Sequence, residues 1–188
     1  MNIITVTGPA EEPVSTAMAD MQCKVETDDE AALLGIYISA ARLKVEAFTR
    51  RRFVTQTVDV RLDGFSAGLT LPIAPVQAVT AVKYLDGDSV LQTVDAADYR
   101  LIQSGVLTCV VPVTGASWPV ALCEPDAVRV TCIVGYGDAE DVPANFVVAM
   151  LLLTGHYYAN RDASLIGVQG GELPLGVKDL LNPHVVWV

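Results

Sequence analysis

The fold is decided by the stretch Ser117-Trp118-Pro119, Glu124-Pro125-Asp126-Ala127-Val128-Arg129-Val130-Thr131, Gly135-Tyr136-Gly137-Asp138 and Val142-Pro143. Apolar and polar residues alternate in its middle, which predicts a half-buried strand. That strand ends in a turn bracketed by two glycines, and a helix is expected to begin at Pro143, because proline is favoured at the first helical position. The stretch holds no nucleophile with a base and no metal-binding cluster, so it indicates architecture rather than chemistry.

The same twofold period extends upstream from this stretch to about residue 54. Val58, Val60 and Leu62 alternate with polar neighbours, and Asp86-Gly87 is a typical hairpin turn. About six or seven short strands are expected between residues 54 and 135, joined by turn residues. This pattern predicts a small antiparallel sandwich or a barrel-like sheet.

Helical periodicity flanks the strands on both sides. Ser15 is a candidate N-cap for a short first helix, and the acidic run Asp28-Asp29-Glu30 is expected to open a longer one. A third helix is expected from Pro143 to about Tyr158, and its middle is so apolar that burial on most sides is predicted. The fold class is therefore α+β: a small helical core with an inserted antiparallel β domain and an extended C-terminal tail. The predicted parts are an N-terminal arm with helices (1–53), the β insertion (54–141), a helix and loop (142–172) and the tail (173–188).

The amino-acid composition limits the classes of function that the protein can have. The chain has 188 residues, 52% of them hydrophobic and 18% charged, with a net charge of −10. The hydrophobic fraction is high, yet no membrane-spanning segment is predicted. Self-association or binding to a partner protein is therefore favoured, because either would cover apolar surface. The net negative charge argues against general binding to nucleic acids, which relies on Lys and Arg. It fits either an ordinary soluble surface or a surface past which DNA slides without sticking. The N-terminus does not read as a signal peptide, and the four cysteines, which form no C-x-x-C pair, are expected as buried free thiols.

Candidate catalytic residues are few. His156 and His184 are the only histidines, and a structural role is favoured because no nucleophile elbow or zinc motif accompanies them. Asp138, Glu140 and Asp141 precede Pro143, which favours capping of a helix start over a metal or acid–base site. The glycines at 135 and 137 fit a turn and not a phosphate-binding loop. No catalytic, cofactor or metal site is predicted.

Two features are candidates for interaction surfaces. The first is a basic cluster, which could complement a helix C-terminus, anchor the chain on an acidic partner or, third in order, contact DNA phosphates; its members are Arg42, Lys44, Arg50, Arg51 and Arg52. The second is the apolar tail, which could fold back on its own core or dock in a groove of another chain. The tail residues expected at such an interface are Leu173, Leu175, Leu180, Leu181, Val185, Val186 and Trp187.

The order and spacing of several short elements resemble the head–tail connector (adaptor) proteins of long-tailed bacteriophages and of phage-derived gene transfer agents. The resemblance extends from about Pro13 to the C-terminus. It rests on the acidic helix start, Ala40-Ala41-Arg42, Leu62-Asp63-Gly64-Phe65, Leu71-Pro72, Pro75-Val76, Tyr99-Arg100, the Trp118–Gly137 segment and the Leu-Pro-Leu-Gly tail. The chain departs from the pattern at Arg50-Arg51-Arg52, where a small residue is usual.

The resemblance implies a structural subunit of a virion or phage-like particle, assembled in the bacterial cytoplasm. Such proteins form a ring, usually dodecameric, beneath the portal; the ring extends the DNA channel and offers a docking face to the next neck or tail-completion protein. It implies no enzyme activity, no cofactor, no specific DNA binding and no membrane. The alternatives are another neck or tail-terminator ring protein, a small hydrolase, or a module that binds a small ligand in its β part.

Overall fold

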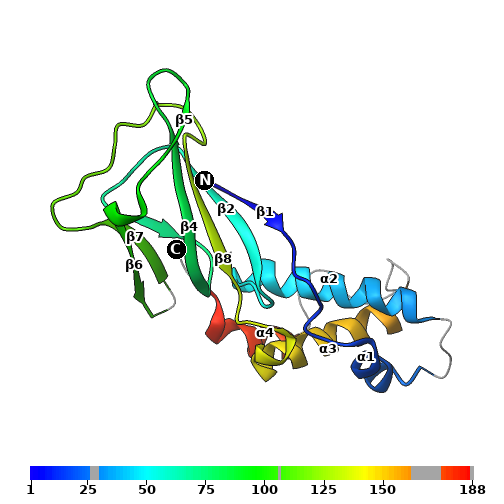
Figure 1. The fold of residues 1–188 in the computed structure, drawn as a ribbon. Helices are drawn as coiled ribbons and strands as arrows, with labels where there is room; N and C mark the ends of the chain where they lie inside the picture. Colours follow the sequence, from blue (N-terminus) through cyan, green and yellow to red (C-terminus); the bar gives the residue numbers. More distant parts are fainter. Residues whose placement is uncertain (26–29, 106, 162–174, 187–188) are drawn as a thin grey trace. The chain divides into compact units, whose positions relative to one another are not determined.

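The structure is a computed structural model, and it describes residues 1–25, 30–105, 107–161 and 175–186 (Figure 1). The chain divides into two compact units. The β unit comprises Met1–Ala10, Thr55–Tyr136 and Val186, and the helical unit comprises Glu11–Val54 and Gly137–Val185. Helices and antiparallel sheets are both present, so the predicted α+β class is confirmed.

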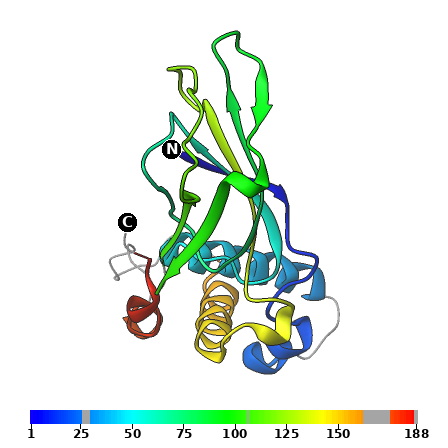
Figure 2. The ribbon, with the colours of Figure 1, turned by 60° about the vertical axis from the view of Figure 1, so that its left-hand side comes forward.

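The β unit contains two antiparallel sheets (Figure 2). The five-stranded sheet has the order β1-β2-β8-β4-β5, and the three-stranded sheet has the order β3-β7-β6. Neither sheet closes into a barrel. The strands are β1 (Asn2–Thr7), β2 (Gln56–Leu62), β3 (Leu69–Leu71), β4 (Val76–Leu85), β5 (Leu91–Thr93), β6 (Tyr99–Ser104), β7 (Leu107–Pro112) and β8 (Val128–Val134).

The alternation of apolar and polar residues along the strands produces the core of the β unit. In β8, Val128, Val130, Cys132 and Val134 are buried, and the residues between them are half-buried. These side chains join one apolar cluster with residues of both sheets, so the two sheets share a core, as in a sandwich. The Asp86-Gly87 turn joins β4 to β5 as predicted.

The N-terminal segment differs from its expectation as an arm. Strand β1 pairs antiparallel with β2, with Asn2 opposite Arg61 and Ile4 opposite Asp59. The sequence shows β propensity here, but only pairing with a strand more than fifty residues later turns that propensity into a sheet edge.

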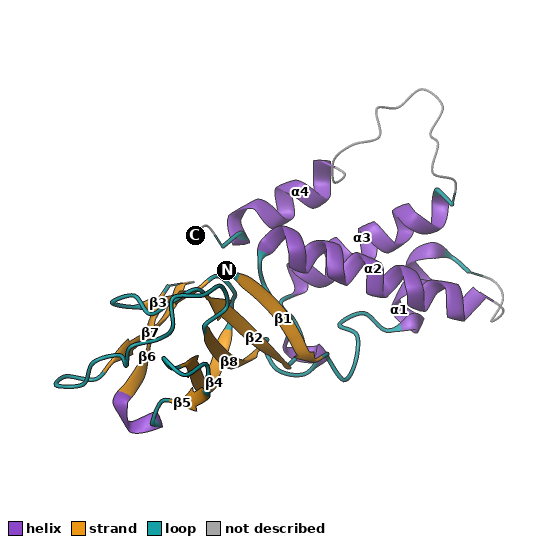
Figure 3. Cartoon of the chain, turned by 90° about the horizontal axis from the view of Figure 1, so that it is seen from above, coloured by secondary structure: helices purple, strands orange, loops and turns teal. Residues whose placement is uncertain are grey.

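The helical unit consists of α1 (Thr16–Cys23), α2 (Ala31–Thr49), α3 (Ala144–Ala159) and α4 (Leu175–Leu181), with short 3-10 turns η3 (Ala139–Asp141) and η4 (Asn182–His184). Helices α2 and α3 lie side by side (Figure 3). The Ser15 side chain caps α1 by accepting the Met18 N–H at 3.2 Å, as the sequence predicts. Asp28 and Asp29, expected to open α2, lie outside the described residues; Glu30 stands at the N-cap.

The turn before α3 follows the sequence closely. Asp138 and Asp141 form a capping box around η3, which confirms capping as the role of these carboxylates. Gly137 has a φ of +146°, and a Cβ there would collide with the Asp141 carboxylate, so this turn requires glycine. Pro143 is the N-cap of α3, so the helix begins at Ala144, one residue after the predicted first helical position.

Helix α3 is covered on most sides, as its composition predicts. It contacts α1, α2 and α4, and Phe146, Met150 and Leu153 are buried. One stripe stays exposed: Val148 is 45% exposed and Leu152 is 39% exposed, four residues apart and therefore on one side of the helix.

Candidate interaction surfaces

The described residues contain no group of three His, Cys, Asp or Glu side chains placed to hold a metal ion. His156 is exposed, and its Nδ1 lies 3.3 Å from the Asn160 amide nitrogen. The His184 ring packs edge-on against Phe146, with 5.1 Å between centroids. No described helix is long and apolar enough to cross a membrane.

The predicted basic cluster divides into inward and outward side chains. Arg42 is 7% exposed and Arg51 is 8% exposed, whereas Lys44 and Arg50 lie on the surface. Arg52 is half-buried; it donates to the Arg51 carbonyl at 3.1 Å. Three of the five cations are thus engaged inside the helical unit, and two face outward.

Arg42 is the centre of an ion-pair network. Its Nε lies 2.7 Å from Glu12 Oε2, and its Nη1 lies 3.3 Å from Glu46 Oε2. Glu46 also lies 3.9 Å from Arg52 Nε and accepts the Phe53 N–H at 3.2 Å. Burial lowers the pKa of Arg42, but hydrogen bonds and charges from Glu12 and Glu46 outweigh burial and raise it. The network ties the chain before α1 and the chain after α2 to the middle of α2.

Arg51 connects the end of α2 to the C-terminal segment. Its Nε donates to the His184 carbonyl at 2.7 Å, and its guanidinium lies 6.0 Å from the centroid of Phe146. Phe53 packs on the same Phe146 ring, with 4.9 Å between centroids. The left-handed conformation of Arg50, with a φ of +55°, ends α2 and turns the chain toward these contacts.

The described part of the tail packs within the subunit. Helix α4 contacts α3 and α2, and Val177 and Leu181 are fully buried. Val186 is also buried, whereas Leu180 and Val185 are half-buried. Leu173, Trp187 and the side chain of Leu175 lie outside the described residues. Any docking of this tail on another chain would require Leu181 and Val186 to leave the positions they occupy here.

A second polar link joins the ends of α2 and α3. Glu30 accepts a short hydrogen bond from the Tyr158 hydroxyl and a 2.8 Å ion pair from Arg161, whose guanidinium lies 4.7 Å from the Tyr158 ring centroid. The hydrogen bond from Tyr158, followed by that from Arg161, holds the pKa of Glu30 below its usual value of 4.5. The same contact with Glu30 raises the pKa of Tyr158.

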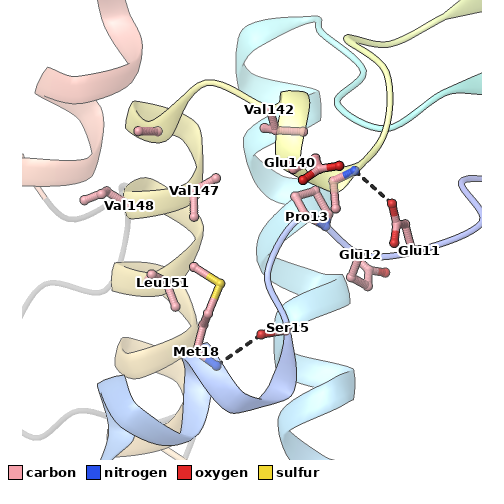
Figure 4. A pocket seen from close by; sticks show the side chains of 12 residues that line it. Glu11, Glu12, Pro13, Ser15, Met18, Glu140, Val142, Val147, Val148 and Leu151 are labelled. Carbon is pink, nitrogen blue, oxygen red and sulfur yellow. Dashed lines mark hydrogen bonds between the residues drawn. The ribbon is translucent and has the colours of Figure 1, made fainter.

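An apolar groove opens beside α1 and α3 in the helical unit (Figure 4). Its volume is about 520 Å³. The Met18, Val147 and Leu151 side chains form its apolar wall, and Glu11 and Glu140 lie at one end. The complete lining is Glu11, Glu12, Pro13, Ser15, Met18, Ala139, Glu140, Val142, Ala144, Val147, Val148 and Leu151. The groove could not be predicted from the sequence, because its lining comes from two segments that are far apart in the chain, residues 11–18 and 139–151.

The outer face of α2 is also apolar. Ile36 is 65% exposed and Leu43 is 55% exposed, seven residues apart and therefore on one side of the helix. Ala32, Ala40 and Ala47 are exposed between and beside them. We call these five residues the α2 ridge. The helical spacing in the sequence could have revealed the ridge, but the opposite, buried face dominates the pattern.

The β unit carries a row of cations on its five-stranded sheet. Arg61 of β2 pairs with Arg129 of β8, and Arg129 pairs with Lys83 of β4. Arg61 also lies 3.5 Å from Asp126. Like charges directly opposite on neighbouring strands are destabilising. This basic row could not be read from the sequence, because it depends on the register of three strands.

No protein-family model matches the sequence, and no curated protein matches it. Solved structures do match, over 100% of this chain and 97% of the matched chain in each of three cases. One is the neck of an empty gene transfer agent particle computed with C6 symmetry (23% identity, TM-score 0.82). The others are the virion of a native gene transfer agent particle (25%, 0.78) and the neck of a native particle computed with C12 symmetry (24%, 0.77). The resemblance to head–tail connectors is confirmed at the level of fold: the chain shares the fold of a protein from the neck of a gene transfer agent particle.

Proposed function

We propose that this protein is a head–tail connector (adaptor) subunit, a structural component of the neck of a phage or phage-like particle. The observation that carries the proposal is the match along the whole chain, in both units, to a protein from a gene transfer agent neck at TM-scores of 0.77 to 0.82. A shared fold alone does not fix a function. Here the exposed apolar surfaces of the helical unit add support, because a subunit of an assembly needs faces for its neighbours.

In this proposal, copies of the chain form a ring, usually of twelve, on the portal protein. The ring extends the DNA channel and joins the capsid to the next neck or tail-completion protein. The symmetries in the titles of the matched neck structures, C6 and C12, support a ring. The net charge of −10 supports a channel through which DNA passes without specific binding, because binding would require many phosphate contacts from Lys and Arg.

The proposed role needs no catalysis and no cofactor, and the protein would reside in the particle after assembly in the bacterial cytoplasm. Partners are the portal protein, the next neck or tail-completion protein and other copies of this chain. The exposed cations of the basic cluster, Lys44 and Arg50, are available to an acidic neighbour, whereas Arg42 and Arg51 are engaged within the subunit.

The experiment that tests the role is imaging of particles that carry a tagged copy of this chain. Density for a ring of the chain between portal and tail supports the proposal. Density at the far end of the tail, or particles that lack the chain but still join heads to tails, would overturn it. Purified protein should also bind duplex DNA weakly at physiological salt.

We keep the C-terminal tail as the proposed portal contact, with Trp187 as its strongest anchor. A tryptophan fills a large pocket at low entropic cost, and truncation of such an anchor costs on the order of 2 kcal/mol of binding. Trp187→Ala should leave unfolding of the isolated subunit unchanged and reduce attachment to portal-bearing heads. Asn182→Ala, an exposed position in the same segment, is the control. Normal attachment of the Trp187 variant would contradict this part of the proposal.

A further inference from the structure

The α2 ridge is a continuous apolar strip with no neighbour among the described residues. Its members follow one another at intervals of four, four, three and four residues, so they stay on one side of the helix: Ala32, Ile36, Ala40, Leu43 and Ala47. The opposite side of α2 buries Leu34, Ile38 and Val45 in the core of the helical unit. Helix α2 is thus apolar on two faces, and one core accounts for only one of them.

The groove beside α1 and α3 is a complementary concave surface. It is lined mainly by apolar side chains, and Val148, at its margin, is 45% exposed (Figure 4). Leu152, one helical turn further along α3, continues the exposed apolar surface. No residue of α2 contributes to the groove lining in the described chain, so ridge and groove could both be occupied at once.

The charges beside the two surfaces are opposite. Lys44 and Arg50 are the exposed cations beside the ridge and at the end of its helix. Glu11 and Glu140 lie at the groove, together with the exposed capping carboxylates Asp138 and Asp141 close by. Opposite charge at the edges of two apolar patches favours one pairing of surfaces and one orientation over others.

We propose that the α2 ridge of one copy of this chain docks in the α1–α3 groove of the next copy. The contact joins two different surfaces, so it is heterologous and propagates from subunit to subunit until the rotation closes a ring. A symmetric dimer through the ridge alone would leave Lys44 and Arg50 without the acidic partners that the groove offers. The inference rests on the proposed ring and adds the two faces that build it.

The first test measures self-association of the full chain by sedimentation velocity over a concentration series. Wild-type protein should form oligomers as its concentration rises. Leu43→Glu in the ridge and Val148→Glu in the groove should each weaken association at least about tenfold, because each places a charge in an apolar contact. Val120→Glu, at a loop position 89% exposed in the β unit, is the matched control and should behave as wild type.

The second test identifies the paired surfaces by cross-linking. Cys23→Ser, Cys109→Ser and Cys123→Ser together remove the three native thiols that are exposed or half-buried, and the remaining Cys132 is fully buried and therefore out of reach of the reagent. In this parent, a chain carrying both Leu43→Cys and Val148→Cys should give a ladder of covalent oligomers with a short bismaleimide. Each single variant alone should give no ladder, and a mixture of the two single variants should stop at dimers.

The outcomes separate this inference from the proposed function. Oligomers without a ladder from the double variant, dimers from Leu43→Cys alone, or a wild type that stays monomeric at every concentration would each overturn the ridge-in-groove contact. Imaging that still finds a ring at the neck would then leave the connector role intact. Conversely, a ladder together with particles that lack the chain at the neck would overturn the connector role and leave the contact standing.

Discussion

The two units differ in how they treat charged side chains. The β unit has a core of valines, isoleucine, leucines and one cysteine, and it buries no charged side chain in the described chain. The helical unit buries Arg42, Glu46 and Arg51, yet it leaves Ile36 and Leu43 on its surface. Both units leave large apolar side chains on the surface, among them Val6 and Val120 in the β unit. The difference therefore lies in the cores: the core of the β unit is apolar, whereas the helical unit adds buried ion pairs to its apolar core.

The largest effect should come from the buried charges. Glu46→Ala removes one of the two carboxylates that pair with the Arg42 guanidinium and the acceptor of the Phe53 N–H. Glu12 still pairs with Arg42, but Arg42 loses its buried partner and the buried Phe53 N–H is left unsatisfied, so the free energy of unfolding should fall by about 3 kcal/mol. Urea denaturation followed by circular dichroism measures this change.

Two variants sharpen the result. Lys44→Ala lies on the exposed side of the same helix and should change stability by less than about 0.5 kcal/mol. Arg42→Met with Glu46→Leu should recover part of the loss, because an apolar pair can replace a buried ion pair, although Phe53 N–H stays without its acceptor. A loss below about 1 kcal/mol for Glu46→Ala would mean that the network behaves as a surface pair.

The β unit should respond to lost volume instead. Val130 is fully buried in β8 at the centre of the sheet. Val130→Ala removes two methyl groups and leaves a small cavity, so the free energy of unfolding should fall by roughly 2 kcal/mol. Val120→Ala, in an exposed loop, should have almost no effect. Equal stability of the two variants in urea would show that this sheet core can collapse around the cavity.

The contrast also explains what could be predicted from the sequence. The β core follows from strict alternation, and the capping box and glycine turn before α3 follow from local chemistry, so all three could be predicted. Burial of Arg42 could not, because its partner Glu12 lies thirty residues upstream and only the packing of α2 brings them together. Strand β1 and the groove could not be predicted either, because each depends on contacts between segments that are far apart in the sequence.

A smaller and pH-dependent effect is expected where α2 meets the end of α3. The folded-state pKa of Glu30 is lowered, first by the Tyr158 hydroxyl and then by Arg161. A carboxyl with a depressed folded-state pKa contributes stability above its unfolded pKa, and that contribution is lost as pH falls through the folded value. Glu30→Gln should therefore lower Tm at neutral pH, and the difference from wild type should vanish well below pH 4.5.

The same link has a second titration at high pH. The folded-state pKa of Tyr158 is raised by its contact with Glu30, so its contribution is present below the unfolded pKa of about 10 and is lost as pH rises through the folded value. Tyr158→Phe removes this alkaline titration and keeps the ring beneath Arg161. A Tm difference between Glu30→Gln and wild type that stays constant from neutral to strongly acidic pH would exclude the link as its source.

The smallest effect should be a gain in stability in the β unit, which buries no charged side chain among its described residues. Arg129 lies between Arg61 and Lys83 across three strands. Like charges directly opposite cost a few tenths of a kcal/mol, so Arg129→Thr should raise the free energy of unfolding by about that much at low salt. The gain should shrink as salt is added, because the half-buried charges still reach the solvent and screening weakens their repulsion. Lys83→Thr, at the end of the row, should gain less because it removes one repulsive pair instead of two. A loss of stability in Arg129→Thr would show that the aliphatic stem of the arginine packs favourably and outweighs the repulsion of its charge.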